Sequence, residues 1–192
     1  MWAEYKRIIK DRGAIVLTAS QPFTSKLVMS NKKMFRHEWI WKKNYSTGFL
    51  NVKRLPMRSH ESILVFGKKS PHYYPVMRTG FKPYNRSVKG GRKTELYSRA
   101  DKPTTSSSNG ERYPITVIEA DRDKQRLHPT QKPVALFEYL IKTYTKKGGL
   151  VLDNCAGSGT TGVACKNLNR DFILIEQEQK YCDKANQRLE EL

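Results

Sequence analysis

The clearest pattern of apolar and polar positions lies near the C-terminal end of the chain. Apolar residues 150–152 precede Asp153 and a loop of small residues, 156–162; a short helical pattern and a second apolar run, 172–175, follow, and that run ends at Glu176. Strand, glycine-rich loop, helix, strand and acid in this order form the opening unit of a Rossmann-like sheet. Glycines allow a close approach to a ligand, and the acid can accept hydrogen bonds from ribose hydroxyls. The pattern therefore predicts a nucleoside-containing cofactor.

The kind of cofactor follows from the acid that precedes the glycines. Gly157, Gly159 and Gly162 satisfy the spacing G-x-G-x-x-G, which alone is a weak dinucleotide signal. The Asp153 carboxylate would repel a pyrophosphate, whereas it suits a cofactor that brings an ammonium and a sulfonium group. We therefore expect S-adenosylmethionine rather than NAD. The alternative is a strand–helix–strand unit whose glycines serve tight packing only.

In residues 2–68, shorter stretches with helical spacing of apolar residues alternate with stretches typical of strands. Apolar spacing predicts helices over residues 2–12 and 23–33. Apolar or alternating runs predict strands over residues 14–19, 37–43 and 61–68. We expect the last two strands to form an antiparallel pair at one edge of a mixed sheet.

Between residues 70 and 125 the regular pattern fails. Five prolines, a glycine pair and the polar run 104–109 interrupt it. Aromatic and cationic residues alternate here, which suits phosphate contacts combined with stacking. A partly disordered basic linker has the same composition, so both interpretations stay open. The regular pattern resumes with an amphipathic helix over residues 133–145 and ends with a helix over about 179–191.

The charge of the chain is extreme and unevenly distributed. The formal net charge is +18. Residues 1–69 hold 15 Lys/Arg against 4 Asp/Glu, residues 70–125 hold 11 against 6, and residues 126–192 hold 10 against 8. A charge excess that served solubility alone would not need this asymmetry. We therefore expect the cationic part to meet a polyanion, a nucleic acid.

Length and cysteine content limit the possible domain organisation and the kinds of site. The 192 residues suffice for one domain with a sizeable core, or for one domain that carries a loose insertion. Cys155, Cys165 and Cys182 form no metal-binding spacing, so we expect no metal site and a reduced, intracellular protein. We expect no membrane span and no signal peptide, because there is no apolar run of about 18 residues.

Three stretches carry a family resemblance. HPTQKP before an apolar helix, then GGLVLDNCAGSGTTGVAC, then NRDFILIEQ before a helix that begins near Tyr181 resemble the amino-group DNA methyltransferases, which act on N6 of adenine or N4 of cytosine. In particular, the order is similar to the circularly permuted group, whose cofactor motifs come last. The resemblance is highly specific over residues 128–189 and good over residues 1–69, where SHESILVFGK is similar to the strand before the family's recognition region.

The resemblance implies a fold and a cofactor site. Residues 1–69 would form the first half of the methyltransferase sheet, 70–125 an inserted and partly irregular target-recognition region, and 126–192 the cofactor-binding half of the same domain. The fold would be α/β and Rossmann-like, with a mixed sheet flanked by helices. By position, the resemblance places these residues around S-adenosylmethionine: Thr130, Gln131, Lys132, Asp153, Ala156, Gly157, Ser158, Gly159, Thr160 and Glu176.

One departure from the family is severe. Its members align the target amine with an Asp/Asn/Ser-Pro-Pro-Tyr/Phe/Trp tetrapeptide, but this sequence has no Pro-Pro pair. By the family order the tetrapeptide and its strand would fall upstream of Met1. That strand would lie between residues 14–19 and the strand that ends at Asp153, so we expect an incomplete sheet. Ser20 to Phe23 (SQPF) resembles the tetrapeptide only superficially, so we assign no catalytic residue.

The leading hypothesis is an S-adenosylmethionine-dependent DNA methyltransferase, adenine N6 favoured, represented by its cofactor- and DNA-binding portion. It would act on double-stranded DNA in the bacterial cytoplasm, as a bacterial or phage-encoded protein, and a second chain could supply the missing strand. Alternatives are a catalytically inactive DNA-binding module and an RNA methyltransferase. The residues expected to contact DNA are Arg58, His60, Lys82, Tyr84, Arg86, Lys89, Arg92 and Lys93.

Overall fold

A computed structural model of the chain describes residues 1–88, 104–125 and 127–192. These fall into two compact units, residues 75–114 and the remainder, which we call the main unit. The separate unit is smaller than the insertion expected over 70–125, because both flanks of that stretch pack with the main unit. The Tyr74 N–H donates to the Thr143 carbonyl at 2.8 Å, and the Ile40 N–H donates to the Thr116 carbonyl at 2.8 Å.

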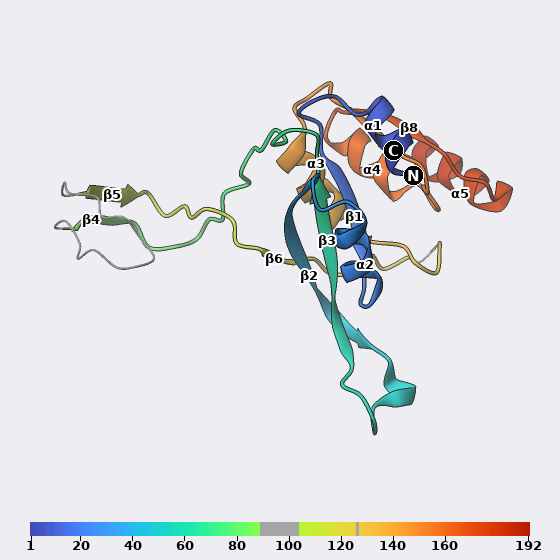
Figure 1. The fold of residues 1–192 in the computed structure, drawn as a ribbon, viewed down its shortest axis with the longest axis horizontal. Helices are drawn as coiled ribbons and strands as arrows, with labels where there is room; N and C mark the ends of the chain where they lie inside the picture. The colour runs from blue at the N-terminus through green and yellow to red at the C-terminus, as the bar shows by residue number, and fades with distance from the viewer. Residues whose placement is uncertain (89–103, 126) are drawn as a thin grey trace. The chain divides into compact units, whose positions relative to one another are not determined.

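The main unit contains a four-stranded mixed sheet in the order β1 (Ile15–Ala19), β3 (Arg58–Phe66), β2 (Phe35–Thr47), β6 (Val117–Glu119) (Figure 1). β3 pairs antiparallel with β1 and β2, and β6 pairs parallel with β2. The sequence pattern predicted the first three strands but not β6, which has three residues only and follows a proline-rich stretch. A strand so short carries no readable alternation.

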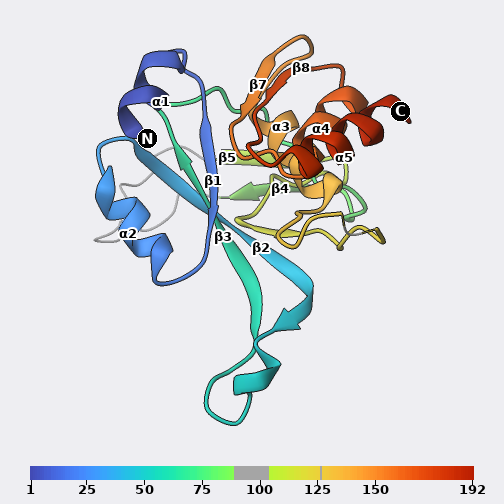
Figure 2. The ribbon, with the colours of Figure 1, turned by 90° about the vertical axis from the view of Figure 1, so that its right-hand side faces the viewer.

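The β2–β3 pair continues well past β1 as a long hairpin arm (Figure 2). β2 exceeds the range expected from the sequence, 37–43, at both ends, whereas β3 begins three residues before the expected 61–68 and ends two residues earlier. The ladder between them continues through Lys42–His60 to Thr47–Arg58 across an irregularity. A short helix, η1 (Phe49–Asn51), closes the arm. The arm therefore carries cationic residues beyond the body of the sheet.

The second sheet of the main unit is the parallel pair β7 (Leu150–Asp153) and β8 (Asp171–Leu174), connected by α4 (Thr160–Asn167). This strand–loop–helix–strand unit confirms the expectation from the apolar pattern. α3 (Val134–Tyr144) precedes it, and α5 (Gln179–Glu190) follows it. Within the described residues β7 does not pair with β1, so the mixed sheet is interrupted where the sequence predicts a missing strand.

Helices pack on both faces of the four-stranded sheet. α1 (Trp2–Ile8) and α2 (Phe23–Ser30) are shorter than the expected helices, ending before the turns that lead into β1 and β2. One core cluster lies on their face and contains Leu27, Leu64 and Phe66. The opposite face packs on α3, where Trp39 and Trp41 lie with Ile63, Val65, Leu136, Leu140 and Tyr144. A third cluster joins α3 to α4 through Ile141, Ala164, Cys165 and Leu168.

The separate unit contains an antiparallel hairpin, β4 (Tyr84–Val88) and β5 (Thr104–Ser108). The sequence pattern did not predict this pairing, because β5 is a run of threonine and serine without apolar alternation. Arginine side chains cover the aromatic rings: the Arg78 guanidinium lies 5.1 Å from the Phe81 ring centroid, and Arg112 lies 4.6 Å from that of Tyr84. Across both units, none of the described helices is long and apolar enough to cross a membrane.

Candidate functional site

The glycine loop connects β7 to α4, and glycine is required at its positions for different physical reasons. Gly157 and Gly159 adopt left-handed φ values of +52° and +76°, which favour glycine. A Cβ atom at Gly159 would lie 2.8 Å from the Ala185 Cβ, and one at Gly162 would lie 2.8 Å from the Leu174 Cδ1. Tight packing of α4 on α5 and β8 therefore accounts for Gly159 and Gly162. This agrees in part with the alternative that the glycines serve packing.

Two carboxylates hold the ends of this loop in place. Asp153 accepts hydrogen bonds from the Cys155 N–H at 3.0 Å and from the Thr161 hydroxyl. Glu176 accepts from the N–H groups of Gly157, Gln177 and Glu178 at 2.8–3.1 Å. These backbone donors, Glu178 and Gly157 foremost, hold the pKa of the Glu176 carboxyl below its usual value. The Glu176 carboxyl is thus kept as an anion beside the loop.

The Thr130–Lys132 segment lies across from the glycine loop, and Gln131 joins the two. The Gln131 Oε1 accepts from the Ser158 hydroxyl at 3.1 Å and from the Leu127 N–H at 2.9 Å. Its Nε2 donates to the Asp123 carboxylate and to the Gln125 carbonyl, each at 3.1 Å. Because the amide is fully engaged with the protein, Gln131 acts as a brace between the two walls.

A cavity of about 990 Å³ lies between these walls. Of the ten residues expected around the cofactor, Gly159 and Glu176 lie outside its lining. Gly159 caps α4 and faces Ala185, while Glu176 supports the loop from its own backbone contacts. The structure brings the other eight together in that lining: Thr130, Gln131, Lys132, Asp153, Ala156, Gly157, Ser158 and Thr160.

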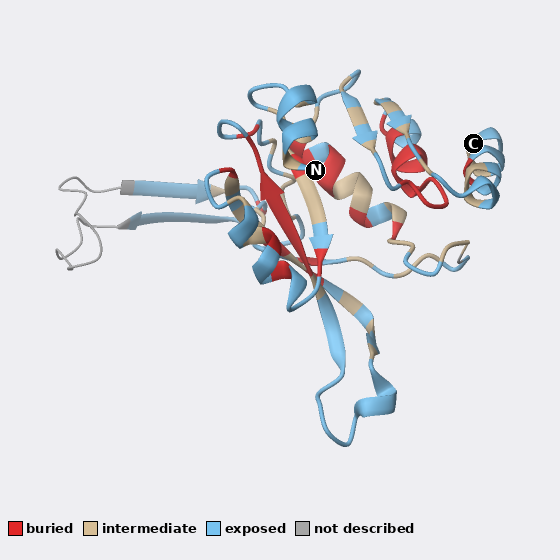
Figure 3. Cartoon of the chain, turned by 45° about the vertical axis from the view of Figure 1, so that its right-hand side comes forward, coloured by how far each residue is buried: buried red, intermediate tan, exposed pale blue. Residues whose placement is uncertain are grey.

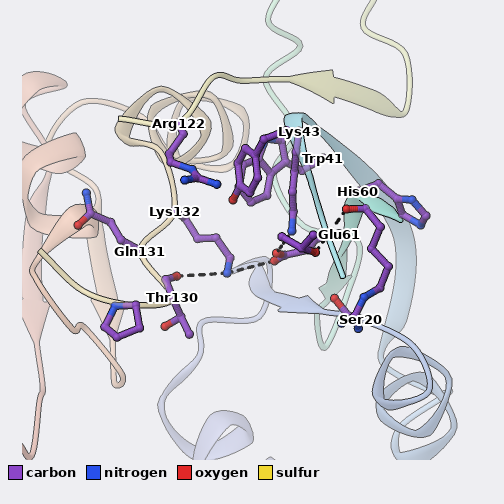
Figure 4. Close-up of a pocket in the computed structure, with 13 residues that line it drawn as sticks. Ser20, Trp41, Lys43, His60, Glu61, Arg122, Thr130, Gln131 and Lys132 are labelled. Carbon is purple, nitrogen blue, oxygen red and sulfur yellow. Dashed lines mark hydrogen bonds and ion pairs between the residues drawn. The ribbon is translucent and has the colours of Figure 1, made fainter. Parts of the chain in front are cut away.

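A second, polar cavity of about 310 Å³ lies on the other side of the Thr130–Lys132 segment (Figure 4). At its centre the Glu61 carboxylate binds two ammonium groups, Lys43 at 2.5 Å and Lys132 at 3.1 Å. Burial alone would raise the pKa of the Glu61 carboxyl, but the two lysines outweigh it and hold the pKa below its usual value. Two cations on one anion leave a net positive charge.

Sequence reasoning found part of this polar cavity and missed the rest. Arg58 and His60, two of the residues expected to contact DNA, line it. Lys43, Tyr45 and Arg122 were missed, and the Arg122 guanidinium lies 3.4 Å from the Tyr45 ring centroid. The strand pattern of residues 37–43 ended too early to include Tyr45, and Arg122 lay within a stretch without periodicity.

The other residues expected to contact DNA belong to the separate unit or lie outside the description. Lys82, Tyr84 and Arg86 are exposed at the start of the β4 hairpin. The Arg112 guanidinium lies 4.6 Å from the Tyr84 ring centroid, and Tyr84 is still 40% exposed. The positions of three further residues lie outside the described part of the chain: Lys89, Arg92 and Lys93.

The SQPF stretch lies at the end of β1. Ser20 lines the polar cavity, whereas the Phe23 ring is 55% exposed on α2. Gln21 accepts hydrogen bonds from the Ser25 N–H and hydroxyl, which occupies it at the start of that helix. Only the serine is therefore placed toward a candidate site.

Comparison with known proteins identifies the family that uses this arrangement. The model of a family described as DNA methylase, covering N6 and N4 amino methyltransferases, matches residues 1–187. This chain belongs to that DNA methylase family. The match confirms the resemblance read from the cofactor stretches, and it extends over the β2–β3 arm and the variable central region.

Two curated members of the DNA methylase group are similar in sequence. The Type II methyltransferase M.HpaI of Haemophilus parainfluenzae is 28% identical over 191 residues, which are 97% of this chain and 56% of that protein. The Type II methyltransferase M2.DpnII of Streptococcus pneumoniae is 52% identical over 63 residues, 33% of this chain and 24% of that protein. The chain thus spans little more than half of the first relative and a quarter of the second.

A solved DNA methylase is similar in structure. The M1.HpyAVI–SAM complex superposes with a TM-score of 0.67 at 29% identity, over 97% of this chain and 79% of that one. PvuII DNA methyltransferase, described as cytosine-N4-specific, shares the fold with a TM-score of 0.59 at 16% identity, over 95% of this chain and 72% of that one. The Rossmann-like methyltransferase fold expected from the sequence is confirmed.

Proposed function

We propose that this chain is the cofactor- and DNA-binding portion of an S-adenosylmethionine-dependent DNA methyltransferase that acts on the exocyclic amine of adenine. One observation carries the proposal: the two cavities share the Thr130–Lys132 segment as a common wall. A methyl donor in the larger cavity and a nucleotide in the polar cavity would meet across that wall. The polar cavity has the size of a small-ligand site, for which about 300 Å³ is the lower end.

The chain's residues fit the donor and the acceptor in different ways. S-adenosylmethionine, when bound, supplies an electrophilic methyl group on its sulfonium. The Asp153 carboxylate lines the larger cavity and favours a cation there, while the Thr161 hydroxyl and the Cys155 N–H hold it in place. On the acceptor side Glu61 neutralises Lys132, so the shared wall does not present an unpaired cation to the sulfonium.

The excess charge of the polar cavity suits a DNA phosphate. A base that is extruded from a duplex brings its flanking phosphates with it. Lys43, Arg58 and Arg122 surround the cavity, and all three cations lie on the main unit. Contacts of this kind position the substrate without reading its sequence. The adenine preference rests on the family resemblance alone, and nucleoside analysis of the methylated product decides it.

The cofactor half of the proposal is tested by calorimetric titration of the 192-residue chain with S-adenosylmethionine. We expect saturable one-site binding that Asp153→Ala weakens by at least about tenfold, roughly 1.4 kcal/mol. Asp171→Ala is the matched control, because this acid lies at the opposite end of the neighbouring strand and is exposed. A folded chain without binding overturns the proposed cofactor site.

The transfer half is tested with labelled S-adenosylmethionine and unmethylated duplex DNA, followed by nucleoside analysis for N6-methyladenine and N4-methylcytosine. Because the chain has no Pro-Pro tetrapeptide, we expect transfer only when a second polypeptide supplies that group and its strand. If the chain alone transferred the methyl group, Ser20 would become the candidate for the polar side chain that binds the target amine. N4-methylcytosine as the product would overturn the adenine assignment.

The missing tetrapeptide favours a second candidate, a DNA-binding module without catalysis. In that case duplex DNA binds, but no added polypeptide restores transfer. Lys82→Ala with Arg86→Ala should weaken binding and make its salt dependence shallower by about two charges. Competition with RNA of equal length separates both candidates from an RNA methyltransferase, for which RNA would win.

A further inference from the structure

Asp123 lies at the centre of a hydrogen-bond network behind the larger cavity. Its Oδ1 accepts from the Val134 N–H at 3.2 Å, and its Oδ2 accepts from the Gln131 side chain at 3.1 Å. The same Oδ2 forms an ion pair with the Arg188 guanidinium at 3.5 Å. Val134 is the first residue of α3, and Arg188 lies in the last turn of α5. One carboxylate therefore fixes α5 to the segment that leads into α3.

The start of α3 explains why a carboxylate is held at this place. Pro133, at the N-cap position, makes no side-chain capping hydrogen bond. The first N–H groups of a helix have no partner within the helix, and the partial positive charge of a helix N-terminus favours an anion. Asp123 supplies the acceptor and the charge from eleven residues earlier in the chain. The fold thus holds this carboxylate in a position from which it orients Arg188.

Arg188 extends the network to the glycine loop. Its Nη1 donates to the Ser158 carbonyl at 3.3 Å and to the Thr160 hydroxyl at 3.1 Å, while its Nη2 forms the ion pair with Asp123. A guanidinium can bind several acceptors at once, because its N–H groups diverge in a fixed plane. The Arg188 side chain is only 18% exposed. It therefore holds the turn at which the loop enters α4.

Ser158 is held from two sides. Its hydroxyl donates to Gln131 and its carbonyl accepts from Arg188, and the residue is 2% exposed. Gln131 and Arg188 both bind Asp123, so these four residues form a closed ring of contacts. A polar network whose members are all satisfied is more rigid than separate pairs. Displacing one member of the ring therefore affects the other three.

The loop needs such a restraint because glycine flanks Ser158 on both sides. Gly157 and Gly159 have φ values of +52° and +76°. Glycine populates many backbone conformations, so ordering it costs more conformational entropy than ordering any other residue. Without outside contacts the peptide groups of the loop would sample several orientations. The ring selects one of them.

The two charged members of the ring lie behind the cofactor wall, and the two others form part of it. Gln131 and Ser158 line the larger cavity, as does Thr160. Among the described residues, Asp123 and Arg188 line neither cavity. The two charged residues can therefore act on a ligand only through the residues that they hold.

We propose that Asp123 and Arg188 are positioning residues of the cofactor site. Without touching the cofactor, they fix the turn from Ser158 to Thr160 in the orientation that receives S-adenosylmethionine. This inference rests on the proposed cofactor site. The sequence resemblance assigns a role to neither residue, and Arg188 lies one residue beyond the stretch that the family model matches, residues 1–187.

The charge of Arg188 makes the proposal sharply testable. S-adenosylmethionine carries one net positive charge, so a nearby cation disfavours its binding. Removing the guanidinium would, by charge alone, strengthen the binding. A weaker affinity after this change therefore reports the loss of positioning.

Calorimetric titration of the 192-residue chain with S-adenosylmethionine is the first test. Arg188→Met should weaken binding by about tenfold, the size of one hydrogen bond to a charged group. Arg188→Lys should restore only part of the affinity, because an ammonium lacks the diverging N–H groups. Asp123→Asn should also weaken binding. Lys166→Met is the matched control and should leave the affinity unchanged, because this lysine ties α4 to the Leu189 carbonyl of α5 without touching the glycine loop.

Amide NMR spectra of the cofactor-free chain are the second test, with a readout that lower stability alone would not change. In Arg188→Met the signals of residues 156–160 should shift or broaden, while those of the four-stranded sheet stay in place. Arg188→Lys and Asp123→Asn should change the same signals in a milder way, so the test does not depend on whether Arg188→Met folds. Urea unfolding of each sample measures its stability separately.

Three results would overturn the proposal: loop signals that do not respond to these variants, an affinity that Arg188→Met leaves equal or raises, or an equal loss of affinity in Lys166→Met. Failure of the proposed function looks different. In that case the unmodified chain does not bind S-adenosylmethionine, and the loop signals still decide whether Asp123 and Arg188 order the loop.

Discussion

Strands β3 and β7 belong to the same fold but differ in how many partner strands they have and in how deeply they are buried. Residues 63–66 of β3 are no more than 1% exposed, with a strand on either side and helices on both faces (Figure 3). β7 has one partner, and its Leu150 and Leu152 remain exposed. β3 is therefore the centre of the stable core, whereas β7 is an edge.

The region around β3 contributes mainly to stability, whereas the region around β7 carries the groups expected to bind the ligand. Around β3 the side chains are held by apolar packing, and the Glu61 carboxylate is paired with Lys43 and Lys132. After β7, hydrogen bonds hold the glycine loop in place, whereas the apolar side chains of Leu150 and Leu152 are exposed. The buried apolar core of the main unit is therefore centred on the four-stranded sheet, and β7 contributes less buried apolar surface to it.

Paired truncations should show the largest contrast. Leu64→Ala in β3 removes a side chain that is 1% exposed, and should lower the free energy of unfolding by about 2–5 kcal/mol. Leu152→Ala in β7 removes one that is 40% exposed and should cost less than about 0.5 kcal/mol. Urea unfolding of both variants measures the two values. Similar losses would mean that β7 is already covered in solution.

A charge change within β3 should have an intermediate effect. Glu61→Gln removes the carboxylate that pairs with Lys43 and Lys132, and should cost about 3 kcal/mol at pH 7 because both buried ammonium groups lose their partner. The pKa of this carboxyl is lowered by folding, so its contribution is complete above the unfolded pKa of about 4.3. The contribution should disappear as the pH falls through the lower folded value.

The control for this prediction is an exposed ion pair on the same sheet. Glu119→Gln breaks a 2.8 Å contact with Lys42 in which both side chains are more than half exposed. It should cost less than about 1 kcal/mol. Unfolding curves at several pH values distinguish the two. An equal loss at both sites, or a Glu61→Gln cost that does not begin to decrease as the pH falls below the unfolded pKa of about 4.3, would contradict the assigned role of Glu61.

The same contrast explains what the sequence predicts. In residues 150–176 strand, loop and helix follow each other locally, so the apolar pattern and the glycines identify the unit without knowledge of distant contacts. The polar cavity is different, because Lys43, Glu61, Arg122 and Lys132 come from four separate segments. Tertiary pairing alone brings them together. Sequence spacing predicted Gln131 at the cofactor wall but not its four hydrogen bonds within the protein, because those arise only on folding.

The smallest expected effect concerns a hydrogen bond between α1 and the residue that follows β7. The Tyr5 hydroxyl donates to the Asn154 Oδ1 at 3.1 Å, on a side chain that is partly exposed. A double-mutant cycle of Tyr5→Phe and Asn154→Ala should give a coupling energy of about 0.5–1 kcal/mol, the value of an ordinary hydrogen bond. A coupling near zero would mean that this hydrogen bond does not link the two sheets in solution. A coupling above about 2 kcal/mol would mean that the halves are already joined, and the contrast between β3 and β7 would then concern exposure alone.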